Sequence, residues 1–329
     1  MPGSVTSVFS EAQDFEAALR AEGGAGLLVT GRGAFRARLT QITLDRLRLA
    51  SAEEEAARIA FFAVPAGTVL IWWLSGGSPA PLWGGIEQRA GDMLTFGPGQ
   101  RVHSRTEEPC RWSAIRLPEE ELLRYGRALC GTEFAAPPAL AVWRPVSAVM
   151  RQLAQLHRAA IRMAQARPGT LADVEAAHGL EQQLIHALIE CLSPAPAQEE
   201  APAARRHRRI LAGFEDLLQA DPFARMAEIC AALGVSDRLL RECCNEHLRM
   251  GPSQYLRLRR MQQVHRALRN ESPDTARVSG VAERYGVRDL GRFASDYRAF
   301  YGELPSATLR RGSNGVTVLS LSRPRVKFL

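Results

Sequence analysis

Arginine side chains recur on two short segments in the last third of the chain, at spacings that suit contact with DNA. The first segment, "SDRLLRECCNE" (236–246), carries Arg238 and Arg241, and the second, "VRDLGRFASDYRAF" (287–300), carries three more. A guanidinium can form two hydrogen bonds with the edge of a guanine base, or a charged contact with a phosphate. Side chains three or four residues apart lie on one face of a helix. Both segments therefore indicate helices that present arginines to a nucleic acid.

The second segment also carries an aromatic stripe. Phe293, Tyr297 and Tyr301 recur every four residues, and the arginines fall outside this repeat. Aromatic residues at helical spacing usually form the buried face of an amphipathic helix. We therefore expect the aromatic residues to pack inward and the arginines to face outward. A merely solvated charged face is the alternative, and the repetition of the motif argues against it.

The positive charge is concentrated toward the C-terminus. The chain has 329 residues and a net charge of +7, and this length allows two domains of ordinary size. Residues 1–204 carry a net charge of −3, whereas residues 205–312 carry a net charge of +7. A basic region of this kind is typical of a domain that binds an anionic partner, most often nucleic acid.

Two helix-turn-helix units are expected to position the arginines. Residues 226–246 predict a short helix, a turn at Gly234, the N-cap Ser236 and a longer helix. Residues 278–300 repeat this scheme around Gly286, and a connecting helix of about 19 residues lies between the units. That helix spans roughly 28 Å at 1.5 Å per residue. Because successive major grooves on one face of DNA lie about 34 Å apart, two recognition helices can reach adjacent grooves.

These motifs resemble the AraC/XylS family of bacterial transcription regulators. The matching positions are Ala231 to Ser236, Leu240, Pro252, Tyr255, residues 256–261, Gly286, Phe293, Tyr297, Arg298, Tyr301, Gly302 and Pro305. The closing "YGELPSATLRR" is similar to the family's end signature, "FGxxPSxxLRR" in outline. The resemblance covers residues 205–312 and implies an all-α domain of seven helices. The chain departs from the family at Glu242 and Ser295, where arginine is frequent, and at Arg249 and Val287.

Ten side chains are expected by position to contact DNA. They are Ser236, Asp237, Arg238, Arg241, Glu242 and Asn245 in the first unit, and Arg288, Arg292, Ser295 and Arg298 in the second. Arg238 and Arg241 are the candidates for bidentate contact with guanine, and Arg298 for contact with phosphate. Glu242 can accept a hydrogen bond from cytosine or orient a neighbouring arginine. The second helix has fewer hydrogen-bonding groups, so we expect it to make mainly phosphate and shape contacts.

The N-terminal region has a β-like pattern followed by helical periodicity. Residues 26–117 combine apolar alternation with Gly and Pro turns, and "IAFFAVPAGTVLIWWL" (59–74) predicts two buried strands around a turn. This pattern is typical of an antiparallel barrel or sandwich. The expected fold class is α+β multidomain, with a cupin-like β-barrel and helices before the all-α domain. The predicted boundaries are 1–192 for a sensor and dimerisation domain, 193–204 for a linker, 205–312 for the DNA-binding domain and 313–329 for a disordered or weakly docked tail.

His103 is the candidate for chemistry in the β region. The stretch "GDMLTFGPGQRVHSRT" (91–106) is roughly similar to the second motif of cupin barrels. A cupin metal site needs further histidines earlier in the barrel, and no histidine precedes His103. We therefore expect no metal, no cofactor and no catalytic residue there. The residues expected to line an effector pocket are Trp72, Trp83, Arg101, His103 and Trp112; core packing is the alternative for the tryptophans.

The sequence as a whole predicts an effector-responsive transcription activator and not an enzyme. Its expected partners are promoter DNA, a small-molecule effector, RNA polymerase and a second copy of the chain, the last through the N-terminal domain as the resemblance implies. A metal-free cupin-like enzyme fused to a DNA-binding domain and a non-specific architectural DNA binder are the alternatives. The six cysteines form no CxxC pair, and we find neither a membrane-spanning run nor a signal peptide. A cytoplasmic, nucleoid-associated protein is expected.

Overall fold

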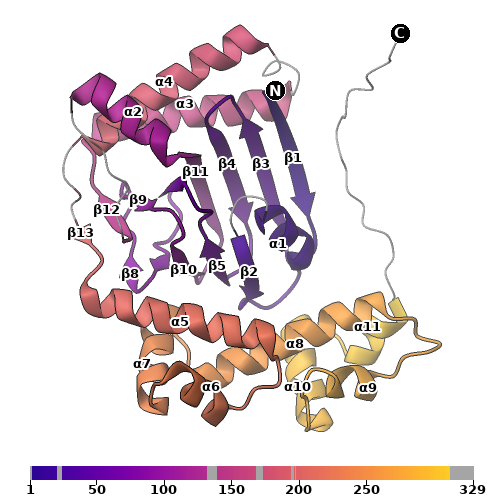
Figure 1. Cartoon of the computed structure of the whole chain (residues 1–329). Helices are drawn as coiled ribbons and strands as arrows, with labels where there is room; N and C mark the ends of the chain where they lie inside the picture. Colours follow the sequence, from indigo (N-terminus) through magenta and orange to yellow (C-terminus); the bar gives the residue numbers. More distant parts are fainter. Residues whose placement is uncertain are drawn as a thin grey trace.

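The elements of the chain stack in four layers (Figure 1). The structure is a computed structural model and describes residues 2–20, 24–131, 139–167, 173–193, 196 and 198–311. Within these residues, three helices cover one face of an eight-stranded sheet, and a five-stranded sheet packs on its other face. Seven further helices form the last layer, and three of them, α5, α7 and α8, contact the five-stranded sheet directly. The two sheets are therefore buried on both faces over much of their area.

Every strand pair in the two sheets is antiparallel. The larger sheet has the order β1 (Gly3–Phe9), β3 (Ala37–Thr43), β4 (Arg48–Glu54), β11 (Cys110–Pro118), β6 (Thr68–Leu74), β9 (Met93–Phe96), β12 (Ala141–Trp143) and β13 (Gln198–Glu199). The smaller sheet has the order β2 (Gly24–Val29), β5 (Arg58–Ala63), β10 (Arg101–Thr106), β7 (Leu82–Trp83) and β8 (Ile86–Glu87). No strand pair among the described residues joins the two sheets. They meet through side chains as an open sandwich, and the closed barrel expected from the sequence is not seen.

The apolar run 59–74 forms two buried strands, as predicted. The strands β5 and β6 follow one another around the turn at Pro65 and Gly67, but they belong to different sheets. In β5, Phe62 packs in the core between the sheets, whereas Ile59 packs against the C-terminal helices. From Ile59 onward the strand is continuously apolar because both of its faces are buried.

Helices pack on both faces of the larger sheet. The helices α2 (Glu119–Cys130), α3 (Ser147–Ala166) and α4 (Val174–Leu192) pack on its outer face, where the helical periodicity predicted them. Helix α1 (Ala12–Arg20) buries Phe15 and Leu19 in the core between the sheets. The strand β1 and helix α1 precede residue 26 and were not anticipated from the sequence.

The seven C-terminal helices agree with the predicted pattern. They are α5 (Pro202–Ala220), α6 (Met226–Leu233), α7 (Asp237–Leu248), α8 (Pro252–Asn270), α9 (Val278–Glu283), α10 (Leu290–Tyr301) and α11 (Pro305–Arg311). The range 193–204, expected as a linker, contains β13 and the first turn of α5. The predicted tail lies outside the described residues. None of the described helices is long and apolar enough to span a membrane.

Candidate DNA-binding surface

The first helix-turn-helix unit is set by local backbone chemistry. Gly234 ends α6 in the left-handed conformation with φ 63°, and Val235 N–H donates to the carbonyl of Cys230 at 3.0 Å. Ser236 then caps α7, because its hydroxyl accepts from the backbone N–H of Leu239 at 3.1 Å. A side chain at position 234 would be strained in this conformation. The turn and cap predicted from the sequence are confirmed.

The second unit repeats this arrangement. Gly286 has φ 73°, and the carboxylate of Asp289 caps α10 by accepting from Arg292 N–H at 2.9 Å. The aromatic stripe packs inward: Tyr297 is fully buried, and its hydroxyl lies 2.7 Å from that of Thr308 on α11. Burial raises the pKa of Tyr297 to about 12. The expected division between buried aromatic residues and outward arginines is confirmed for Phe293 and Tyr297, whereas Tyr301 is only partly buried.

All ten side chains predicted to meet DNA are exposed to solvent. Six lie on α7 or its cap, and four lie on α10 or immediately before it. Each unit has its own apolar core behind the exposed face, so these residues other than Ser236, which caps α7, contribute little to folding. Their exposure leaves them accessible to a partner.

Two ion pairs organise the exposed face of α7. Arg238 Nε lies 3.0 Å from Glu242 Oε1, and Arg241 lies 2.7 Å from Asp237 Oδ2. Both pairs span four residues of the helix, a spacing that brings side chains together. Glu242 therefore orients a neighbouring arginine, as one of its two predicted roles requires. Exposed pairs of this kind contribute only about 0.3–0.5 kcal/mol, so a base or a phosphate can displace them easily.

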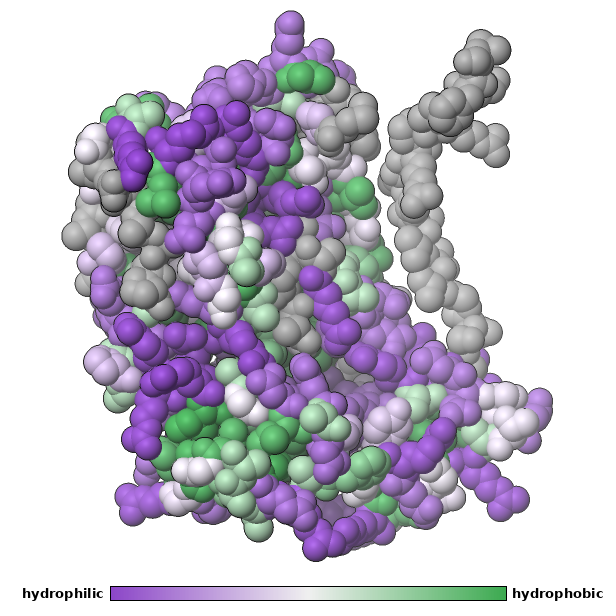
Figure 2. Space-filling view, viewed as in Figure 1, coloured by the Kyte–Doolittle hydropathy of each residue, from purple (hydrophilic) through white to green (hydrophobic). Residues whose placement is uncertain are grey.

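A groove of about 750 Å³ separates the two units. Arginines from α8 and from the starts of α6 and α10 line it, together with an apolar floor. Its arginines are Arg225, Arg257, Arg260, Arg288 and Arg292. The first three were not predicted to contact DNA, although "LRLRRM" at 256–261 already signalled a basic stretch. Figure 2 shows apolar side chains gathered over α6 and α7, bordered by hydrophilic ones.

Comparisons with known proteins agree with this geometry. A family model described as a helix-turn-helix domain matches residues 229–311. The XylDLEGF operon transcriptional activator of Pseudomonas putida is 34% identical over 97 residues, which are 30% of this chain and 29% of that protein. A probable thc operon regulatory protein of Rhodococcus erythropolis is 33% identical over 85 residues, 26% of each chain. Residues 229–311 form a helix-turn-helix domain of the AraC/XylS family.

Solved structures similar to the chain include proteins described as AraC-like. The AraC-like transcriptional activator CuxR matches 80% of this chain and 94% of its own, with 16% identity and a TM-score of 0.43. A probable AraC family transcriptional regulator from Rhodopseudomonas palustris matches 31% of this chain and 96% of its own, with 27% identity and a TM-score of 0.29. The chain spans less than a third of the length of the two curated relatives above.

The five residues predicted to line an effector pocket fall into two groups. Trp72, Trp83 and Trp112 are buried together between the sheets, and the ring centroids of Trp72 and Trp83 are 4.8 Å apart. A cavity beside Trp72 and Trp112 measures only about 20 Å³. This volume holds at most one water molecule. Core packing, the alternative interpretation, describes these tryptophans better.

Arg101 and His103 face the AraC/XylS-type domain. On β10 the residues at 101, 103 and 105 point toward the C-terminal helices, whereas Val102 lies in the core between the sheets. Arg101 lies 2.7 Å from Asp216 Oδ2, and Arg105 donates to the carbonyl of Leu248. Alternation along the strand explains this division, because successive side chains point to opposite faces.

Glu215 is the buried centre of the contact between the domains. Its carboxylate lies 3.1 Å from His103 Nε2 and accepts hydrogen bonds from the Tyr255 hydroxyl and the Arg259 guanidinium. Burial acts to raise the pKa of Glu215, but the hydrogen bond from His103 and the charge of Arg259 outweigh it and lower the pKa to about 2. The carboxylate is therefore ionised inside the interface, and it joins a sandwich strand to α5 and α8.

Further contacts hold α8 to the N-terminal domain. The Gln262 amide pairs with the backbone N–H and carbonyl of Val29, and Arg266 lies 2.8 Å from Glu16. A cavity of about 640 Å³ lies between the domains. Its lining combines the cations Arg20, Arg259 and Arg266 with the apolar residues Leu28, Ile59 and Phe61. The N-terminal domain therefore touches both the first unit and the helix that joins the two units.

Proposed function

We propose that the chain is a sequence-specific DNA-binding transcription regulator. The observation that carries the proposal is the paired arrangement: two capped recognition helices with exposed polar faces, joined by α8 of 19 residues. A basic charge over residues 205–312 suits the phosphate backbone. Activation is the proposed sign of regulation because the Pseudomonas putida relative is a transcriptional activator, and an activator would contact RNA polymerase.

The two units are proposed to act differently on DNA. Arginines neutralise phosphates and release counterions, which makes the affinity depend on salt. Residues of α7, led by Arg238 and Arg241, then read base edges in one major groove. Helix α10, which begins with Leu290 and Gly291, contributes mainly phosphate and shape contacts in the next groove. The chain would do this in the cytoplasm, at promoter sites.

The N-terminal region, residues 1–192, is proposed to sense an effector and to dimerise. Its two packed sheets are compatible with a cupin-like ancestry, although the sheets are open. The interdomain cavity, and not the tryptophan cluster, is the proposed effector site, because a ligand there would touch both domains. Its lining combines arginines, which pair with Glu16 and Glu215 in this structure, with apolar residues, and so suits a small anion with an apolar body that displaces one of these pairs. Such a ligand would alter how the N-terminal domain holds α8, and hence the placement of the recognition helices.

Selection of bound fragments from bacterial genomic DNA tests the proposal. Purified full-length protein at near-physiological salt should enrich a motif with two short boxes about one helical turn, or ten base pairs, apart. One box alone would mean that α10 holds the backbone without reading bases. If enrichment appears only after cell extract is added, an effector is required for binding. Equal recovery of all sequences with and without extract would contradict the proposal and favour an architectural binder.

Arg241→Ala is expected to weaken binding and to relax the preference at one base. A bidentate contact with guanine contributes about 1–3 kcal/mol of discrimination, so affinity for the selected site should fall roughly 5–150-fold. The loss of base preference should be confined to the base pair that Arg241 reads. Titration of the selected site and of its single-base variants, by fluorescence anisotropy, measures both effects.

Arg298→Ala is the matched control for that experiment. It removes one exposed arginine from α10, where we propose contact with phosphate. Affinity should fall for all sequences alike, and the salt slope should decrease by about 1. If Arg241→Ala behaves in the same way as Arg298→Ala, then Arg241 contacts phosphate and the assignment of its role is wrong.

A further inference from the structure

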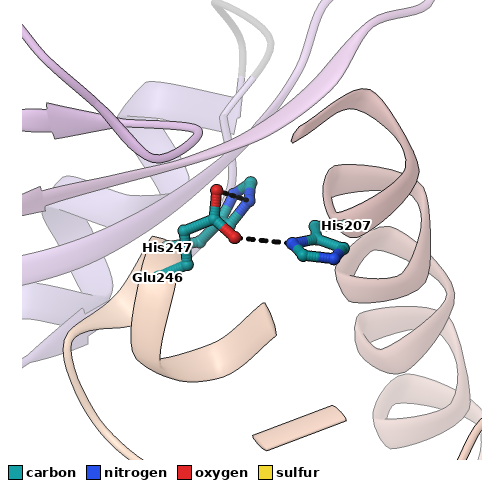
Figure 3. A group of neighbouring side chains, drawn as sticks. All are labelled: His207, Glu246 and His247. Carbon is teal, nitrogen blue, oxygen red and sulfur yellow. Dashed lines mark hydrogen bonds and ion pairs between the residues drawn. The ribbon is translucent and has the colours of Figure 1, made fainter. Parts of the chain in front are cut away.

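Three metal-ligating side chains converge behind the first recognition helix (Figure 3). His207 comes from α5, whereas Glu246 and His247 come from the last turn of α7. One ligand atom from each lies within 4.8 Å of the other two. His207 Nδ1 lies 2.5 Å from Glu246 Oε2, and His247 Nε2 lies 3.9 Å from Glu246 Oε1.

The His247 ring is buried without a hydrogen-bond partner. Its side chain is 0% exposed, and among the described residues neither ring nitrogen has a partner within hydrogen-bond range. Of the other two fully buried histidines in the described chain, His103 meets Glu215 and His157 meets the carbonyl of Ala114. A buried polar group without a partner costs about 1–3 kcal/mol. His247 Nε2, which faces Glu246 and has no hydrogen-bond partner, therefore indicates a site for a bound ligand.

The donor set selects the class of that ligand. Two imidazole nitrogens and one carboxylate oxygen suit Zn²⁺ and related divalent transition metals, whereas Mg²⁺ and Ca²⁺ prefer oxygen ligands alone. A neutral imidazole has one ring nitrogen with a lone pair for a metal, and neither ring nitrogen of His247 is occupied by a hydrogen bond among the described residues. The neighbouring Cys243 lies outside the group, and burial raises the pKa of its thiol to about 11.

We propose that His207, Glu246 and His247 bind one divalent transition metal ion of the Zn²⁺ class. Solvent would supply the remaining position of a four-coordinate site. Tetrahedral coordination with bonds of about 2.0–2.1 Å places ligand atoms roughly 3.3 Å apart, so the group must contract. His207 allows this movement because its side chain is partly exposed, at 20%.

Such an ion would join the first recognition helix to the helix that leads out of the N-terminal domain. The group also adjoins that domain. A Cβ atom added at Gly85, in the turn between β7 and β8, would lie 3.1 Å from Glu246 Oε1. Two residues beyond the group, Arg249 lies 3.1 Å from Glu87 on β8. Metal binding would thus fix α7 relative to α5 at the edge of the domain contact. This inference does not depend on the DNA-binding proposal.

Calorimetric titration of the chelator-treated full chain with Zn²⁺ tests the site. We expect one ion per chain and a higher melting temperature with the ion bound, because a ligand of the folded state stabilises it. Mg²⁺ should not bind at this site. His207→Gln and Glu246→Gln should each weaken Zn²⁺ binding by more than about 100-fold, since loss of an outer-shell partner alone costs 10–100-fold. His186→Gln removes an exposed histidine beside Glu190 on α4 and should leave binding unchanged.

The two glutamine variants and the spectrum of bound Co²⁺ provide further tests of the metal site. His207→Gln and Glu246→Gln change side chains that are not fully buried, so both should fold even where a His247 variant fails. The visible spectrum of bound Co²⁺ reports a four-coordinate site, and its near-ultraviolet spectrum should show no sulfur-to-metal charge transfer. The proposal is overturned if the chain binds no Zn²⁺. It is also overturned if both glutamine variants bind as the unmodified chain does, or if Cys243→Ser abolishes binding.

Discussion

Replacing Glu54 by alanine is expected to lower the free energy of unfolding by about 3–5 kcal/mol. Glu54 and Arg58 form an ion pair inside the sandwich, and both side chains are 0% exposed. The guanidinium donates to Glu54 at 2.7 and 3.0 Å, and the Trp112 indole N–H donates to the same carboxylate. Without the carboxylate, Arg58 stays charged in an apolar core with only Ser104 as a partner. Urea denaturation followed by circular dichroism measures the loss.

Glu53→Ala is the matched control for this pair. Glu53 lies next to Glu54 on β4, but its partners Arg38 and Arg111 are exposed and lie at 3.6 and 3.7 Å. Its loss should change stability by no more than about 0.5 kcal/mol. A second control replaces both Glu54 and Arg58 by apolar residues of similar size, which should restore much of the stability. If Glu53→Ala and Glu54→Ala lower the free energy of unfolding equally, the buried pair contributes no more to stability than an exposed one.

Glu215→Gln is expected to destabilise the domain contact and to change its dependence on pH. The carboxylate, with a pKa of about 2 in the folded chain, is faced by His103 on β10, Tyr255 and Arg259 on α8, and Cys244 on α7. A carboxyl whose pKa is lowered by folding stabilises the folded state above its unfolded pKa of about 4.3. That stability is lost as the pH falls from about 5 toward 2. At 1.36 kcal/mol per pKa unit, it is on the order of 3 kcal/mol.

Denaturation at a series of pH values distinguishes this contribution from others. The unmodified chain should lose stability steeply between about pH 5 and 2, and Glu215→Gln should flatten that part of the profile. At neutral pH the variant should already be less stable, because Arg259 then lacks its carboxylate partner. Asp216→Asn is the control, since the neighbouring Asp216 is 56% exposed and pairs with Arg101 at the surface. An unchanged acid profile in Glu215→Gln would show that the carboxylate contributes nothing to this pH range.

The helix-turn-helix units were predictable because short-range chemistry determines them. Gly234 and Gly286 adopt the left-handed conformation, and Ser236 and Asp289 make N-cap hydrogen bonds, the first of which the sequence predicted. Each of these features depends on residues a few positions apart. The helical periodicity after Glu119 is equally local, and it predicted α2, α3 and α4 closely.

Long-range packing explains what the sequence did not reveal. The pattern of β10 shows two faces, but nothing in it says that Arg101 and His103 meet α5 and not a ligand. Arg58 and Glu54 look like an ordinary surface pair until β4, β5 and β10 bury them together. The metal-ligating group likewise depends on α5 packing beside α7, which brings His207 to His247 without any motif spacing. Such sites exist only after distant elements have met.

The uninterrupted helix α8 fixes the rotation of the second helix-turn-helix unit relative to the first. An α-helix turns by about 100° per residue, so one inserted residue would rotate everything after it by that angle. The second recognition helix would then face a different side of the duplex, while each unit kept its own core. Insertions or deletions within residues 252–270 should therefore be far less tolerated than substitutions on the helix surface. The length of α8 therefore sets both the distance and the relative rotation of the two units. These two quantities decide which spacings between two DNA boxes the chain can recognise.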